Sequence, residues 1–225
     1  MSKEKIARLG YFSKADLKPE AVPGEPDQMI LNLNLGEMST GELSFGFGYS
    51  SASGGFFQAA ITEKNFLGKG QRVGLSANFA EDKNEYTFSF IEPAFLDMNL
   101  WAGYELSRIT RDYRSTSGYK YITNGVAVKA GYSYTDYLSQ SWKLGYRQDQ
   151  ITDIIAEASD YIQSLEGSKN VVSLSQTLSY DRRRMVGETG GYIITLGNEY
   201  AGFGSDENFL KTDIGFAYGK GIASW

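Results

Sequence analysis

The sequence has 225 residues and a formal net charge of −5, and it contains neither cysteine nor histidine. Disulfides, thiolate or histidine metal sites and histidine-dependent catalytic triads are therefore excluded, and we expect no enzyme activity, cofactor or metal site. The acidic balance, 22 Lys and Arg against 27 Asp and Glu, also argues against nucleic acid as a partner. With 26 Gly, 16 Tyr and 13 Phe against 4 Pro, the composition favours many strands joined by tight turns.

Residues 1–38 differ from the rest of the chain. The predicted elements are a helix over 3–9, a strand over 11–18, a proline-rich turn over 19–26 and a strand around Leu31, Leu33 and Leu35. So short a segment cannot bury a core of its own, so we expect it to be the end of a larger α+β domain. The first residues also lack the apolar stretch of a signal peptide, and the chain is expected to be part of a longer protein.

From residue 39 to 225, apolar side chains alternate with Gly, Ser, Thr and charged residues, which indicates strands with one apolar face. Ten strands are predicted, over 41–50, 55–64, 71–81, 84–92, 100–111, 121–135, 138–149, 170–181, 190–201 and 208–221. Most approach the roughly 9–11 residues that a tilted strand needs to cross a bilayer, whereas strands of soluble sandwiches are typically about five or six residues long. The predicted fold class is therefore all-β, a transmembrane antiparallel β-barrel, with a soluble β-sandwich as the alternative.

Aromatic residues near strand ends support the barrel, because Tyr and Trp gather at membrane interfaces. They are Tyr49, Trp101, Tyr113, Tyr134, Tyr137 and Tyr200.

Charged residues of the predicted strands share the face that carries Gly and Ser, opposite the aromatic residues, and this face would line the barrel lumen. The expected lumenal charge network consists of Glu105, Lys129, Lys143, Arg147, Asp181, Arg182, Glu199, Lys211 and Asp213. The densest cluster, residues 181–184, is interpreted as ion pairs at the inner mouth with carboxylates such as Glu199. A contact to an accessory protein or to lipid head groups is the alternative.

The connections between the predicted strands alternate in length, as they do in membrane barrels. The short ones are residues 65–70, 93–99, 136–137 and 182–189. The longest, residues 150–169, falls on the opposite side and carries apolar residues at helical spacing: Ile151, Ile154, Ile155, Ala158, Ile162 and Leu165. We predict a surface helix there, packed on the barrel mouth, with a membrane-active or partner-binding helix as the alternative.

Five short segments, in this order and spacing, resemble the BamA family of bacterial outer-membrane protein assembly factors. They are Arg8-Leu9-Gly10-Tyr11-Phe12, residues 40–49, residues 63–70 with Asn65-Phe66-Leu67-Gly68-Lys69-Gly70, Glu92-Pro93-Ala94-Phe95 and Ser179-Tyr180-Asp181. The resemblance implies that 1–38 is the end of a periplasmic POTRA domain and that 39–225 is the first part of an outer-membrane barrel. It also implies outer-membrane lipid, unfolded outer-membrane protein clients and assembly-complex lipoproteins as partners.

Members of this family insert clients at a lateral gate, where client strands add to a barrel edge. The gate strand implied here consists of Gly41, Glu42, Leu43, Ser44, Phe45, Gly46, Phe47, Gly48, Tyr49 and Ser50. An edge strand fits this role because its unpaired backbone groups are costly in lipid, and Gly46 and Gly48 weaken a strand that must open.

The sequence departs from the family at its end, because family barrels continue through further strands and a loop with a V-R-G-F/Y motif. We therefore expect the chain alone not to insert clients. A passive pore or adhesin remains an alternative function, and a soluble binding module is a second one.

Overall fold

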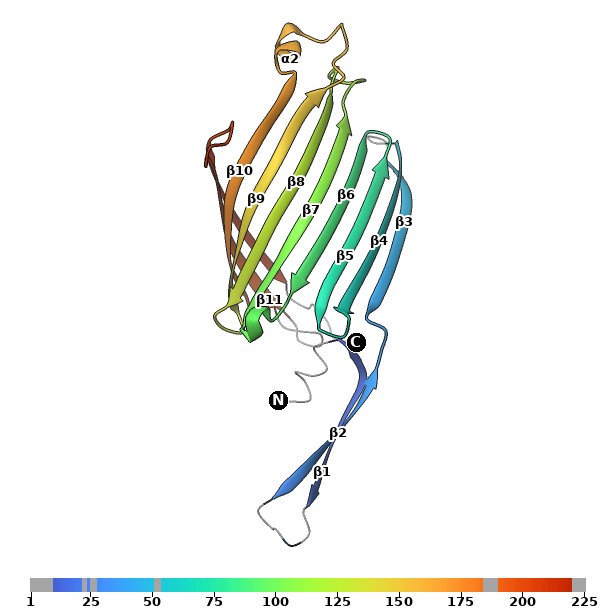
Figure 1. The fold of residues 1–225 in the computed structure, drawn as a ribbon, viewed down its shortest axis with the longest axis vertical. Coiled ribbons are helices and arrows are strands. Elements are labelled where there is room, and N and C mark those ends of the chain that lie inside the picture. The colour runs from blue at the N-terminus through green and yellow to red at the C-terminus, as the bar shows by residue number, and fades with distance from the viewer. Residues whose placement is uncertain (1–9, 22–23, 25–27, 51–53, 184–189, 220–225) are drawn as a thin grey trace.

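The structure is a computed structural model that describes residues 10–21, 24, 28–50, 54–183 and 190–219. The helix predicted over 3–9 lies outside these residues, as do 184–189 of a predicted turn and 220–221 of the last predicted strand. β1 (Phe12–Ala21) and β2 (Met29–Glu37) form an antiparallel hairpin that projects from one end of the main sheet (Figure 1).

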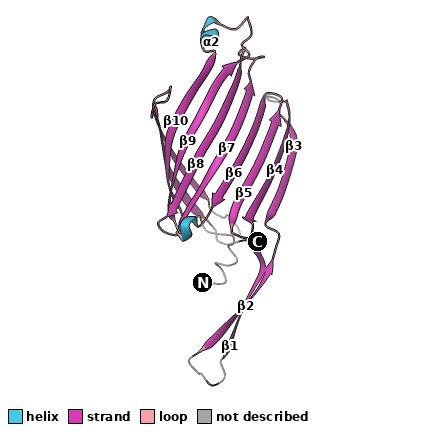
Figure 2. Ribbon diagram, viewed as in Figure 1, coloured by secondary structure: helices cyan, strands magenta, loops and turns pink. Residues whose placement is uncertain are grey.

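The main sheet has ten antiparallel strands, each paired with its neighbours in the sequence. They are β3 (Gly41–Ser50), β4 (Gly54–Phe66), β5 (Gln71–Ala80), β6 (Lys83–Glu92), β7 (Leu100–Asp112), β8 (Lys120–Ser133), β9 (Leu138–Thr152), β10 (Gly167–Asp181), β11 (Gly191–Ala201) and β12 (Phe209–Gly219). The ten predicted strands are thus confirmed with small shifts at their ends, and the all-β class with them. Helix is confined to η1 (Phe95–Asp97) and α2 (Asp160–Ser164), at opposite ends of the sheet within the described chain (Figure 2).

The sheet is curled but open. Its order runs from β3 to β12 without a β12–β3 pair, so each of these two strands has one neighbour among the described strands. In Figure 1 the sheet curves so that its last strands pass behind β9 and β10. This is an incomplete barrel wall, as predicted, and it contains no second sheet packed face to face among the described strands, which rules out the β-sandwich alternative.

The two faces of the sheet differ in character. The convex, outer face exposes large apolar side chains, with Leu43, Phe45 and Phe47 between 70% and 83% exposed. Among the described residues the buried apolar side chains are Ala127, Val171 and Ala201, all on the opposite, inner face. A water-soluble protein buries its large apolar residues, whereas this arrangement suits a wall that meets lipid.

Register corrects one member of the predicted aromatic belt. Trp101 pairs with Gly131, and its indole lies where a Cβ on that glycine would be 2.4 Å from Nε1. Its neighbours Leu100 and Ala102 face outwards, and because successive side chains of a strand alternate, Trp101 faces inwards. Tyr200, opposite Leu174 and Leu210, lies on the outer face.

The hairpin β1–β2 is longer than predicted, since β1 continues through Pro19 to Ala21, where a turn was expected. Pro19 pairs with Leu31. In a two-stranded ribbon one side of each strand has no partner, so a residue without an N–H is tolerated there.

The predicted helix over 150–169 is wrong in its extent. Residues 150–152 extend β9 and Gly167 begins β10, which leaves the five-residue α2, capped by the Ser159 hydroxyl at the Ile162 N–H. Ile151 pairs with Tyr121 on β8 and with Gly167 on β10, so its backbone has a strand on both sides. This pairing prevails over the helical spacing of the apolar side chains. Ile155 instead ties the loop to the β7–β8 connection, where its N–H donates to the Gly118 carbonyl at 2.9 Å.

Candidate functional site

The edge strand β3 contains all ten residues predicted for the gate. On one side it pairs with β4 over its whole length, from Gly41 opposite Glu63 to Ser50 opposite Gly54. On the other side no described strand pairs with it. Alternate N–H and C=O groups of β3 therefore point away from the sheet and are available to an added strand.

Polar contacts hold the start of β3 against β4. The Thr40 hydroxyl donates to the Glu63 carboxylate at 2.5 Å, and the Lys64 N–H donates to the Thr40 carbonyl at 3.2 Å. Lys64 also forms an ion pair with Glu42 at 3.2 Å. This end of the edge strand is thus fixed next to the β4–β5 turn.

Two of the three glycines of β3, Gly46 and Gly48, make room for side chains of β4 on the inner face. A Cβ on Gly48 would be 2.6 Å from the Phe56 ring, and one on Gly46 would be 2.9 Å from the Gln58 amide. The Phe56 and Gln58 side chains thus occupy the space that a side chain at position 48 or 46 would need. The glycines therefore have a packing role in addition to the strand weakening expected from sequence.

The predicted lumenal charge network separates into several groups. In the first, Glu105 on β7 contacts Lys129 on β8 at 2.5 Å and Lys143 on β9 at 3.6 Å. The two lysines are direct cross-strand partners, and like charges in that position repel. Glu105 compensates both, so one carboxylate links three strands.

A second group surrounds Arg147 and includes residues not predicted from the sequence. Its Nε donates to Asp149 at 2.8 Å, its Nη2 lies 3.9 Å from Glu207, and Glu207 also pairs with Lys169 at 3.2 Å. Asp149 could have been found from the i, i+2 spacing that places it on the same face as Arg147. Glu207 lies in the β11–β12 loop, and nothing in the sequence pairs that loop with β9.

Among the described residues, the predicted residues Glu199, Lys211 and Asp213 form no ion pair with either of these groups. Lys211 and Asp213 pair with each other on β12 at 3.1 Å. Glu199 lines an inner-face pocket of about 200 Å³ together with Lys143 and Arg147.

The Asp181–Arg184 cluster does not pair with Glu199 in its described part, contrary to the interpretation above. Asp181 instead binds Arg183 at 2.6 Å. The Arg182 guanidinium lies 4.8 Å from the centre of the Tyr137 ring. The pKa of Arg182 is raised, mainly by a hydrogen bond with the Tyr180 side chain. The contact between Arg182 and Tyr137 therefore joins the residues that follow β10 to the β8–β9 turn.

The part of the chain that the structure describes holds neither a metal site nor a membrane-spanning helix. No three or more acidic side chains in them gather to hold a metal ion. None of the helices described here is long and apolar enough to span a membrane.

Comparison with known proteins identifies relatives along most of the chain. It is 26% identical to the outer membrane protein assembly factor BamA of Neorickettsia risticii over 214 residues, which are 95% of this chain and 29% of the relative. It is 30% identical to the BamA of Nitratidesulfovibrio vulgaris over 223 residues, 96% of this chain and 27% of that protein. The chain therefore spans less than a third of the length of these curated relatives.

Solved structures show the same fold. BamA from Haemophilus ducreyi, in a form lacking POTRA domains 1–3, matches with a TM-score of 0.76 and 24% identity over 96% of this chain and 44% of that one. CdiB from Acinetobacter baumannii matches with a TM-score of 0.66 and 11% identity over 95% of this chain and 41% of that one. Both likenesses support a transmembrane barrel wall.

The relatives and the fold together place the chain in the bacterial outer membrane. Residues 65–224, well over half of the sequence, match the Omp85 superfamily domain. They include every strand from β5 to β12. On this match the chain belongs to the Omp85 superfamily.

Proposed function

We propose that this chain is the first part of the barrel of an outer-membrane protein assembly factor, and that β3 pairs with strands of client barrels during their insertion. The observation that carries this proposal is the free edge of β3, a ten-residue strand with an apolar outer face and no partner on one side among the described strands. Unpaired backbone groups in lipid are costly, so an incoming strand that satisfies them is strongly favoured.

In this proposal, residues 1–38 are the end of a POTRA domain on the periplasmic side and 39–225 begin the barrel. The hairpin β1–β2 projects from the end of the sheet at which β3 begins, and this position supports the assignment (Figure 1). The partners would be membrane lipid, unfolded client proteins and assembly lipoproteins, and the chain would have no catalytic residue or cofactor.

The inner charge groups are proposed to stiffen the wall behind the gate. Glu105 links β7, β8 and β9, and Glu207 links β9, β10 and the β11–β12 loop. Within the described residues, the one ion pair of β3 is that of Glu42 with Lys64, next to the Thr40–Glu63 hydrogen bond at the start of the strand. Strand exchange at β3 would then leave the rest of the wall unchanged.

Cysteine cross-linking tests the gate directly, because the native sequence has no cysteine. Ser44→Cys and Glu42→Cys place a thiol on the same face of β3, and single cysteines are scanned along a terminal strand of a client whose folding is stalled. In membranes of cells that make the protein, we expect disulfides at S44C, with the linked client position moving by two residues for E42C, since residues i and i+2 share a face.

Ser141→Cys is the matched control, because Ser141 lies in β9 with a paired strand on either side. Cross-linking of the client to S141C as efficiently as to S44C, or no fixed register along β3, would show that β3 is not the receiving edge. If the chain were a passive pore or an adhesin, neither S44C nor E42C would form a disulfide with a client.

A further inference from the structure

A polar row crosses the outer face of the wall near the end of the sheet opposite β1–β2. Successive cross-strand partners on β6 to β10 form it: Tyr86, Arg108, Asn124, Gln148 and Asn170. The next outward row towards β1–β2 is apolar and consists of Phe88, Leu106, Val126, Tyr146 and Val172. Such a change from apolar to polar side chains is expected where acyl chains give way to lipid head groups.

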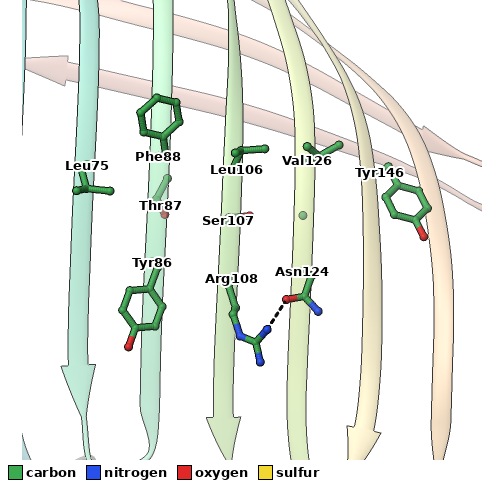
Figure 3. A pocket seen from close by; sticks show the side chains of 11 residues that line it. Leu75, Tyr86, Thr87, Phe88, Leu106, Ser107, Arg108, Asn124, Val126 and Tyr146 are labelled. Atoms are coloured by element: carbon green, nitrogen blue, oxygen red, sulfur yellow. Dashed lines mark hydrogen bonds between the residues drawn. The ribbon is translucent and has the colours of Figure 1, made fainter.

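A groove of about 390 Å³ lies across this boundary, between β5 and β9. Figure 3 shows Leu75, Phe88, Leu106 and Val126 side by side at one level, with Arg108 and Asn124 at the next. Tyr86 and Tyr146 flank the groove, each 44% exposed. The groove therefore has a long apolar part and a cationic end.

The cation at that end, Arg108, has no ionic partner among the described residues. Arg108 is exposed, and in its one hydrogen bond among the described residues it donates to the side-chain oxygen Oδ1 of Asn124 at 3.3 Å. No described carboxylate forms an ion pair with it, whereas the arginines at 114, 147 and 183 each have one. The Asn124 amide nitrogen also donates no hydrogen bond within the described chain, and in Figure 3 it lies at the level of the Arg108 guanidinium, on the side of the amide away from it.

We propose that this groove binds a phosphate-bearing acylated lipid of the membrane leaflet farther from β1–β2. Arg108 and the Asn124 amide would donate to the phosphate, for which a guanidinium has matching donors and charge. An acyl chain would lie over Leu106 and Val126. An arginine on a lipid-facing surface is costly unless an anion compensates it, and a head-group phosphate is the anion present at this depth. This inference does not depend on the gate function proposed above.

The test uses the full chain in detergent, titrated with lipid A as the phosphorylated lipid and with bound lipid counted by native mass spectrometry. Arg108→Gln removes the charge, and we expect lipid A to bind about tenfold more weakly or worse, the loss typical of a hydrogen bond to a charged group. Arg108→Lys keeps the charge and should recover part of the affinity. Dephosphorylated lipid A should bind the wild type weakly and be indifferent to Arg108→Gln.

Arg111→Gln is the matched control, because Arg111 lies on the same strand but pairs with Lys83 and Tyr121 on the inner face. It should leave lipid A binding unchanged. Equal loss in R108Q and R111Q, or undiminished binding to R108Q, would overturn the proposal. Binding of inorganic phosphate as tight as that of lipid A would also overturn it, since the apolar groove would then contribute nothing.

Discussion

At the scale of single residues, the β4–β5 turn explains why glycine stands at positions 68 and 70 of the segment 65–70. Leu67 and Gly68 both adopt positive φ, at 55° and 73°, which is the pattern of a type I′ hairpin turn. Gly70 has φ of 72°, and its N–H donates to the Asn65 side chain at 2.7 Å. The Gly70 carbonyl accepts from the Tyr11 hydroxyl at 3.3 Å, so the turn also joins the barrel wall to the segment before β1.

Alanine at the two turn glycines should separate backbone strain from contact. Gly68→Ala meets no atom within 4 Å and should cost about 1 kcal/mol of unfolding free energy, from the left-handed backbone alone. Gly70→Ala adds a methyl 3.3 Å from the Tyr11 hydroxyl and should cost about 2–3 kcal/mol. Urea unfolding in lipid vesicles measures both. If Tyr11→Phe does not reduce the excess cost of G70A, the Tyr11 contact is not its source.

At the scale of elements, strand pairing depends on how closely neighbouring backbones approach. Gly103 on β7 pairs with Ile91 on β6, and a Cβ there would be 2.3 Å from the Phe90 carbonyl oxygen. A backbone atom cannot rotate away as a side chain can. Gly145 on β9, also on the inner face, has more space, since the nearest atom to its Cβ would be the Ser173 hydroxyl at 3.6 Å.

These two glycines make a matched pair for testing the wall. Gly103→Ala should separate β6 from β7 locally and cost about 1–3 kcal/mol, the usual range for overpacking. Gly145→Ala should be neutral or stabilising by up to about 1 kcal/mol, because it removes glycine's entropic disadvantage. Unfolding in vesicles gives both values. Equal effects at the two positions would mean that the close approach at Gly103 relaxes freely.

At the scale of the whole molecule, the decisive feature is a ten-stranded sheet with unlike faces, whose two edge strands have no outer partner among the described strands. Large apolar side chains lie outside, and the ion pairs of Glu105 and Arg147 lie inside. This is the reverse of a soluble protein, and it is stable only where the outer face meets lipid.

Tryptophan fluorescence tests this assignment of faces. Trp142, 46% exposed, lies on the outer face opposite Gln176, whereas Trp101 lies on the inner face over Gly131. In vesicles with brominated acyl chains, the W101F/W225F double variant should be strongly quenched, because its remaining Trp142 contacts the chains. The W142F/W225F variant should be quenched far less. The opposite ranking would invert the two faces.

The sequence by itself determined the positions of the strands and the faces of their side chains, because two-residue alternation and turn glycines are local properties. The incomplete wall and the edge strand from residue 41 to 50 came instead from the resemblance to the BamA family. The sequence failed where backbone pairing competed with a local pattern, as at Ile151, whose helical spacing gave way to strand pairing on both sides.

Only the tertiary structure decided which charges meet. Curvature and loop placement bring Glu207 to Arg147 and Lys169, and register sets Glu105 between two lysines on neighbouring strands. The same register leaves Arg108 on the outer face without a carboxylate partner in the part of the chain that the structure describes. Such contacts depend on distances between strands, and the alternation of side chains along one strand does not predict these distances.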